Sequence, residues 1–308
     1  MEFFQDILVY AFLQKALITS VVVGISCGII GSFIVLRGMA LMGDAISHAI
    51  LPGVAISYIL GINYFYGAVV VGVLTALGIG VISEKSRIKS DAAIGIVFSA
   101  AFAFGIILIT SAQSAIDLTQ ILFGNVLYVR TMDMWLTILV GCILLLIVVL
   151  FYKELLISSF DETMAKVYGL KTRFIHYGIM VLLTLVTVAS IQTVGVILVV
   201  SLLITPASTA YLLTNRLSVM IVLASLFGAL SSIIGIYFSY VHNLPSGPVI
   251  ALAATAIFLV ALVFSPKQGL LMPRLKKKKT IKQKLNSQFI LIFKLKLVKQ
   301  LKENISKK

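Results

Sequence analysis

The sequence predicts an all-α, polytopic membrane protein with about nine transmembrane helices, with eight and ten as the alternatives. Of its 308 residues, 60% are hydrophobic and the mean hydropathy is +1.11, which no soluble globular domain is expected to show. Apolar runs long enough to cross a bilayer alternate with short polar segments. We therefore predict a transmembrane permease-type domain over 1–270 and a basic cytoplasmic tail over 271–308.

Nine apolar runs account for the predicted spans. The sixth and seventh are separated only by the segment IQTVGV, so the region 175–213 could hold a broken or re-entrant helix. In the first run Gly24, Gly28 and Ser32 are spaced by four, which lets another helix approach closely. The runs lie at about 16–36, 41–60, 65–83, 92–111, 132–152 and 175–190, then a seventh ending near 213, 219–240 and 249–265.

The charge distribution predicts the orientation. From Lys267 to Lys308 there are 14 Lys and Arg and one acid, a net charge of +13, whereas the rest of the chain carries +1. A basic segment directly after a membrane span favours a cytoplasmic end over nucleic-acid binding. Each span moves the chain to the other side of the membrane, so counting the spans back from the cytoplasmic end predicts that 84–91 and 153–174 are also inside. The segments predicted outside are 61–64, 112–131, 191–195, 241–248 and the N-terminus.

The run 41–60 reads LMGDAISHAILPGVAISYIL and carries an acid and an imidazole. Asp44 and His48 are four residues apart, so on a helix they share one face. Pro52 continues that face, and in a continuous helix its missing N–H would free the carbonyl of His48. A second stripe of small residues beside it would suit close helix packing. It consists of Ala45, Ala49 and Gly53.

A charged side chain within a membrane span costs several kcal/mol unless it is compensated, which makes Asp44 a candidate functional residue. The structural alternative is that Asp44 pairs with Arg37 and that His48 is a satisfied core histidine. The pair on one face, followed by a proline, favours the functional interpretation.

A second informative segment is the inner loop 153–174. Its residues Phe160, Met164, Val167 and Leu170 are apolar and alternate with charged ones, which predicts a short amphipathic helix ended by Gly169. Such a helix could fit a groove on a soluble motor, or simply cap the bundle. The sequence contains no G-x-x-x-x-G-K-[ST] motif, so ATP hydrolysis would belong to a separate polypeptide.

Three motifs in order resemble the permease family of bacterial ABC importers for manganese, zinc and iron, and within it the manganese permeases of Gram-positive bacteria. They are GDAISHAILPGVA at 43–55, SFDETMAKVYGL at 159–170 and GVILVVSLLITPASTAYLL at 195–213. The resemblance covers about residues 10–270 and excludes the lysine-rich tail. It implies a multi-pass protein of the bacterial cell membrane that is not itself an enzyme.

The resemblance also implies partners and site residues. The partners would be a second permease copy, two cytoplasmic ATPase subunits and an extracellular solute-binding lipoprotein. Asp44 and His48 would form a transient metal site, and Pro52 and Pro206 would mark helix kinks along the pathway. No cofactor would be bound permanently. The coupling helix, in contact with the ATPase, would include Phe160, Asp161, Glu162, Met164, Ala165, Lys166 and Gly169.

The donor set suits several metals. Two copies around a twofold axis would bring together two Asp44 and two His48, a mixed oxygen and nitrogen set suited to manganese, zinc or ferrous iron, in that order of preference.

Two other functional classes remain for this chain: a secondary metal transporter that needs no ATPase, and a structural subunit that anchors a complex. The first usually carries more intramembrane ionisable groups, and the second would not need the Asp44 face.

Overall fold

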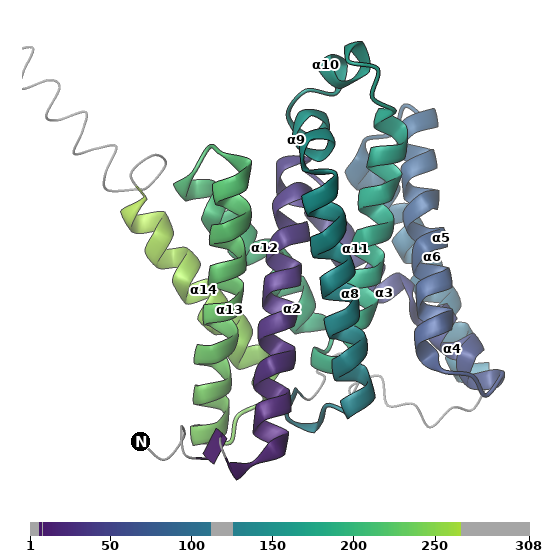
Figure 1. The fold of residues 1–308 in the computed structure, drawn as a ribbon. Helices are drawn as coiled ribbons and strands as arrows, with labels where there is room; N and C mark the ends of the chain where they lie inside the picture. The colour runs from purple at the N-terminus through teal and green to yellow at the C-terminus, as the bar shows by residue number, and fades with distance from the viewer. Residues whose placement is uncertain (1–5, 8, 112–125, 266–308) are drawn as a thin grey trace, which may run out of the picture. The chain divides into compact units, whose positions relative to one another are not determined.

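A computed structural model describes residues 6–7, 9–111 and 126–265, and these residues form helices without strands (Figure 1). The predicted tail 271–308 and most of the predicted outer loop 112–131 lie outside the described residues. The helices are α2 (Ala11–Leu36), α3 (Leu41–Ala49), α4 (Leu51–Ile59), α5 (Tyr64–Lys85), α6 (Ser90–Ser111), α8 (Thr131–Leu150), α9 (Tyr152–Phe160), α10 (Glu162–Val167), α11 (Thr172–Val194), α12 (Val196–Leu213), α13 (Leu217–His242) and α14 (Ser246–Phe264), with a short 3-10 helix at Val126–Tyr128.

By their internal contacts the residues divide into two units, Met1–Phe258 and Leu259–Lys308. The first holds every helix from α2 to α13 and most of α14. Of the second, the structure describes 259–265, and α14 ends at Phe264. Everything below concerns the first unit.

The all-α membrane architecture is confirmed. In the described part of the chain, eight helices are long and apolar enough to cross a bilayer, and they coincide with eight of the nine predicted spans. The remaining span, 41–60, is built differently from the expectation. It consists of two nine-residue helices, α3 and α4, that meet at Ile50.

The interruption at Ile50 has a local cause. Pro52 is the second residue of α4, and proline is tolerated in a first helical turn because its missing N–H would have no partner there. The prediction of one continuous helix over 41–60 was therefore wrong, and Pro52 is not an interior helix residue. The other suspected break is present: α11 and α12 meet at Gly195, whose φ of +83° favours glycine.

Helix α2 is the most buried of the eight long helices and packs closely against α13. A Cβ atom added to Gly24 would lie 2.5 Å from the carbonyl oxygen of Gly228, and one added to Gly28 would lie 2.7 Å from the backbone of Ala224. Glycine is thus required for the observed approach of the two backbones. The close packing predicted from the spacing of Gly24 and Gly28 is confirmed.

The predicted inner and outer segments gather at opposite ends of the bundle. At one end Arg173 pairs with Glu84, and α9 and α10 lie at the same end (top of Figure 1). At the other end Lys15 donates to the Thr131 hydroxyl at 2.7 Å, where α2 and α8 begin. We refer to these as the inner and outer ends, after the orientation predicted from the sequence.

Candidate functional site

The structure places Asp44 and His48 on one face of α3. His48 Nε2 lies 3.6 Å from Asp44 Oδ1. The Asp44 side chain is 48% exposed and that of His48 is 23% exposed, so neither is enclosed by its own chain. Both donors therefore remain open to a ligand from the same side of the helix.

Neighbouring helices hold α3 in place. The His48 ring lies against the rings of Phe98 and Phe102 of α6, with centroid separations of 5.8 and 5.7 Å. On another side of α3, Gly43 approaches the Leu203 side chain of α12, to which an added Cβ would be 2.8 Å distant. Aromatic contact on one side of the imidazole orients it, and the absence of a Cβ at Gly43 lets α12 come close.

The pair alone cannot complete a metal coordination sphere. Within the described ranges, no cluster of three or more His, Cys, Asp or Glu side chains could hold an ion. Asp44 and His48 supply one hard oxygen donor and one imidazole, a set that suits Mn²⁺, Fe²⁺ or Zn²⁺. Further ligands would have to come from water or from another chain.

Arg37, the residue offered as an alternative partner of Asp44, points elsewhere. Its Nη2 donates to Ser158 Oγ at 2.7 Å and its Nε donates to Ser159 Oγ at 3.2 Å, both on α9. Its Nη1 lies 3.4 Å from Nδ1 of His176. Burial lowers the pKa of Arg37, and the negative charge of Glu162 opposes this shift in part. Arg37 thus connects the end of α2, just before α3, to α9.

The segment 159–170 is less regular than the predicted single helix. Helix α9 ends at Phe160, and the six-residue α10 starts after Asp161, whose carboxylate accepts hydrogen bonds from Thr163 N and Met164 N, both at 2.9 Å. This N-cap explains the break between the two helices. As predicted, a glycine ends the segment, since Gly169 has a φ of +75°.

The side chains of this segment face outward. Phe160, Met164 and Val167 are 57%, 49% and 77% exposed, whereas Ala165 is fully buried. An ion pair of 2.8 Å joins Lys166 to Glu162, and this hydrogen bond lowers the pKa of the Glu162 carboxyl. A helix that merely capped the bundle would turn its apolar side chains inward.

The two singled-out prolines occupy different contexts. Pro52 lies in the first turn of α4, two residues after the interruption at Ile50. Pro206 lies inside α12 and is buried, and it has no N–H to offer the carbonyl of Leu202. Both mark points where regular helix bonding is interrupted.

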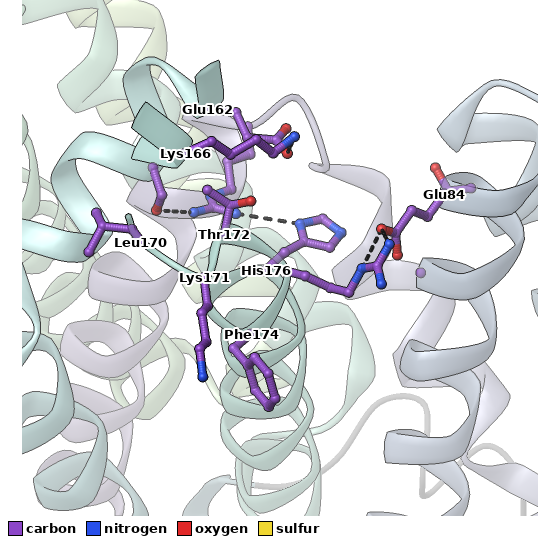
Figure 2. Close-up of a pocket in the computed structure, with 13 residues that line it drawn as sticks. Glu84, Glu162, Lys166, Leu170, Lys171, Thr172, Phe174 and His176 are labelled. Carbon is purple, nitrogen blue, oxygen red and sulfur yellow. Dashed lines mark hydrogen bonds and ion pairs between the residues drawn. The ribbon is translucent and has the colours of Figure 1, made fainter. Parts of the chain in front are cut away.

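A cavity of about 550 Å³ opens at the inner end, between the ends of α5, α9, α10 and α11 (Figure 2). The sequence did not predict this cavity. Glu84 accepts from Arg173 Nε at 2.6 Å and from the Tyr177 hydroxyl at 3.0 Å, which joins α5 to α11. The charged inner loops 84–91 and 153–174 were the available signal, but nothing in the spacing showed that they meet.

Sequence similarity to known proteins extends over nearly the whole chain. The family model described as "ABC 3 transport family" matches residues 9–265. The "Manganese transport system membrane protein MntC" of Listeria monocytogenes is 65% identical over 271 residues, 88% of this chain and 97% of its own. The "Manganese import system permease protein ScaB" of Streptococcus gordonii is 51% identical over 275 residues, 89% of this chain and 99% of its own.

A solved structure is similar as well. "PsaBC from Streptococcus pneumoniae in complex with Fab" contains a chain that matches with a TM-score of 0.80 and 52% identity, over 89% of this chain and 99% of that one.

Proposed function

This chain belongs to the ABC 3 transport family, and from this premise we propose that it is the membrane permease of an ATP-driven importer that carries Mn²⁺ across the cell membrane. It is a multi-pass protein of that membrane. The observation that carries the proposal is the face of α3 on which Asp44 and His48 lie 3.6 Å apart and open to a ligand.

Two arguments support manganese as the cargo. The relatives MntC and ScaB, 65% and 51% identical, are both named for manganese. A carboxylate oxygen and one imidazole bind Mn²⁺ without the thiolates that would favour zinc or copper. Such a small ligand set also suits transport, because the ion must leave the site again.

The incomplete ligand set supports a paired permease. One chain offers Asp44 and His48, and two chains related by a twofold axis would offer two carboxylates and two imidazoles to one ion. The open side of α3 would then face the partner copy. Pro52 and Pro206, at interruptions of regular helix bonding, would allow the lining helices to adjust as the ion passes.

The segment 159–170 is the proposed contact with a separate ATPase subunit. Its exposed apolar residues are Met164 and Val167 on the capped helix α10 and Phe160 just before it. The shape of the segment is set by Asp161, Glu162, Lys166 and Gly169. Ala165 anchors it to the bundle. An exposed apolar group of this kind marks a protein interaction site rather than a solvated loop. An extracellular binding protein would deliver the metal to the outer end.

Uptake of radiolabelled manganese tests the proposal. In manganese-depleted cells that lack other importers, the wild-type chain with its ATPase should take up the metal, and Asp44→Asn should reduce uptake at least tenfold. Asp91→Asn is the matched control, because Asp91 is an exposed acid in the first turn of α6.

Three results would count against parts of the proposal. Equal uptake by Asp44→Asn and the wild type would remove Asp44 from the pathway. Uptake of zinc alone would replace the metal but keep the mechanism. Manganese uptake that persists when the ATPase is inactivated would indicate a secondary transporter.

A further inference from the structure

The inner cavity has a chemistry of its own, and it does not include Asp44 or His48. Basic side chains from three separate segments line it, and Figure 2 labels two of them, Lys166 and Lys171. Two carboxylates also line it, those of Glu84 and Glu162. The cations that line it are Arg37, Lys166, Lys171 and Arg173.

Two of the four cations are neutralised within the cavity wall. Arg173 pairs with Glu84, and Lys166 pairs with Glu162 at 2.8 Å. Both pairs are largely exposed, so each contributes little to stability and can rearrange around a ligand. Arg37 and Lys171 are left as the excess positive charge.

Neither Arg37 nor Lys171 has a carboxylate within ion-pair distance in the part of the chain that the structure describes. The partners of Arg37 are the neutral hydroxyls of Ser158 and Ser159 and the ring of His176. Lys171 Nζ lies 5.8 Å from the centroid of the Phe174 ring. A half-buried guanidinium with uncharged partners retains a desolvation cost that an anion in the cavity would offset.

The surroundings match the inner surface of a membrane. The first turn of α11, a 23-residue helix, carries no acidic side chain, so the positive end of its dipole adds to the field of the cations. Phe174 is 75% exposed beside the cavity, as expected of an aromatic residue at the membrane–water boundary. Basic pockets between membrane helices on the cytoplasmic side are a known form of anionic headgroup site.

We propose that this cavity binds a phosphate group, supplied in the cell by the headgroup of an anionic lipid of the inner leaflet. Arg37 and Lys171, which both line the cavity, supply the positive charge for the phosphate, and the Arg173–Glu84 and Lys166–Glu162 pairs form other parts of its wall. A bound headgroup would connect α11 with the end of α2 and so stabilise the inner end. This inference needs the membrane orientation but not the manganese cargo.

Lipid binding can be measured without transport. The full chain, purified with the subunits that accompany it, is placed in nanodiscs of phosphatidylcholine with or without phosphatidylglycerol. Native mass spectrometry counts retained phosphatidylglycerol, and thermal unfolding reports the stabilisation. Lys171→Gln removes one cation of the site, whereas Lys171→Arg keeps it. Lys153→Gln is the matched control, an exposed lysine of α9 at the same end that does not line the cavity.

We expect Lys171→Gln to bind phosphatidylglycerol about fivefold more weakly and to lose most of the thermal shift. Lys171→Arg and Lys153→Gln should behave as the wild type. If inorganic phosphate added to phosphatidylcholine discs gives the same Lys171-dependent shift while the lipid gives none, the site stands but its ligand is a free phosphate. Equal lipid binding by Lys171→Gln, Lys153→Gln and the wild type would overturn the proposal, since it would show general surface attraction alone.

Discussion

Arg37 Nη2 donates a 2.7 Å hydrogen bond to the hydroxyl of Ser158, which links the residue that follows α2 to the helix that leads into α10. Helix α3, which carries Asp44 and His48, starts four residues after Arg37. Movement of α9 and α10 would therefore reach α3 through this contact. It is a physical connection between the proposed ATPase contact and the proposed metal site.

The first prediction concerns this connection. Arg37→Lys keeps the charge but loses the planar arrangement of donors that reaches Ser158 and Ser159 together. A hydrogen bond from a charged group is worth about 1.5 kcal/mol, so we expect about a tenfold fall in manganese transported per ATP hydrolysed. The assay is reconstituted transport and hydrolysis in the same liposomes. Arg87→Lys, in the inner loop 84–91, is the control, and an unchanged ratio in Arg37→Lys would exclude the connection.

The second prediction concerns metal choice. Replacing His48 by cysteine puts a soft thiolate donor beside Asp44, and thiolates favour zinc over manganese. We expect unlabelled zinc to inhibit manganese uptake by His48→Cys at concentrations roughly tenfold lower than for the wild type. Ser47→Cys is the control, because the Ser47 hydroxyl donates back to the Gly43 carbonyl at 2.8 Å and is buried away from the site. Identical zinc inhibition in His48→Cys and Ser47→Cys would place His48 outside the ion's path.

The third prediction concerns the packing of α2. Gly24→Ala places a methyl group 2.5 Å from the Gly228 carbonyl oxygen, a backbone atom that cannot move aside, so we expect destabilisation of about 1–3 kcal/mol. Gly95→Ala in α6 meets no atom within 4 Å and should be neutral or slightly stabilising, because alanine favours the helix. Thermal unfolding of both variants in detergent gives the comparison. Similar unfolding temperatures for the two variants would contradict the close α2–α13 contact.

The fourth prediction concerns the proposed ATPase contact. Val167 is 77% exposed on α10, so Val167→Asp should leave the folded permease intact while it places a charge in an apolar interface. We expect co-purification of the ATPase to fall at least tenfold. Ile88→Asp makes the same change at another exposed position of an inner loop and should retain the ATPase. If both variants retain it equally, the contact lies elsewhere on the inner surface.

The hydropathy and length of single segments were sufficient for the architecture. A membrane span must satisfy its backbone hydrogen bonds internally and be long enough to cross the hydrocarbon, so hydropathy and length alone located the eight long helices. The spacing of Gly24 and Gly28 also located their contact face, because small residues four apart in an apolar helix let another helix pack closely against it. The face shared by Asp44 and His48 followed from the same periodicity.

The positions where helices are interrupted could not be predicted from hydropathy. Hydropathy does not distinguish one helix over 41–60 from two that meet at Ile50, since Pro52 is compatible with a kink or with a new first turn. The same holds for 159–170, where Asp161 serves as an N-cap rather than as a charge on a continuous helix.

The sequence by itself determined that this chain is an all-α, multi-pass membrane protein, and that Asp44 and His48 share a face. Only the tertiary structure decided that Arg37 reaches α9 instead of Asp44, and that Lys171 lies with Arg37 around one cavity. The physical reason is that periodicity and hydropathy act within one helix. Contacts such as Arg37 with Ser158 join residues far apart in the chain, and they depend on how separate helices pack.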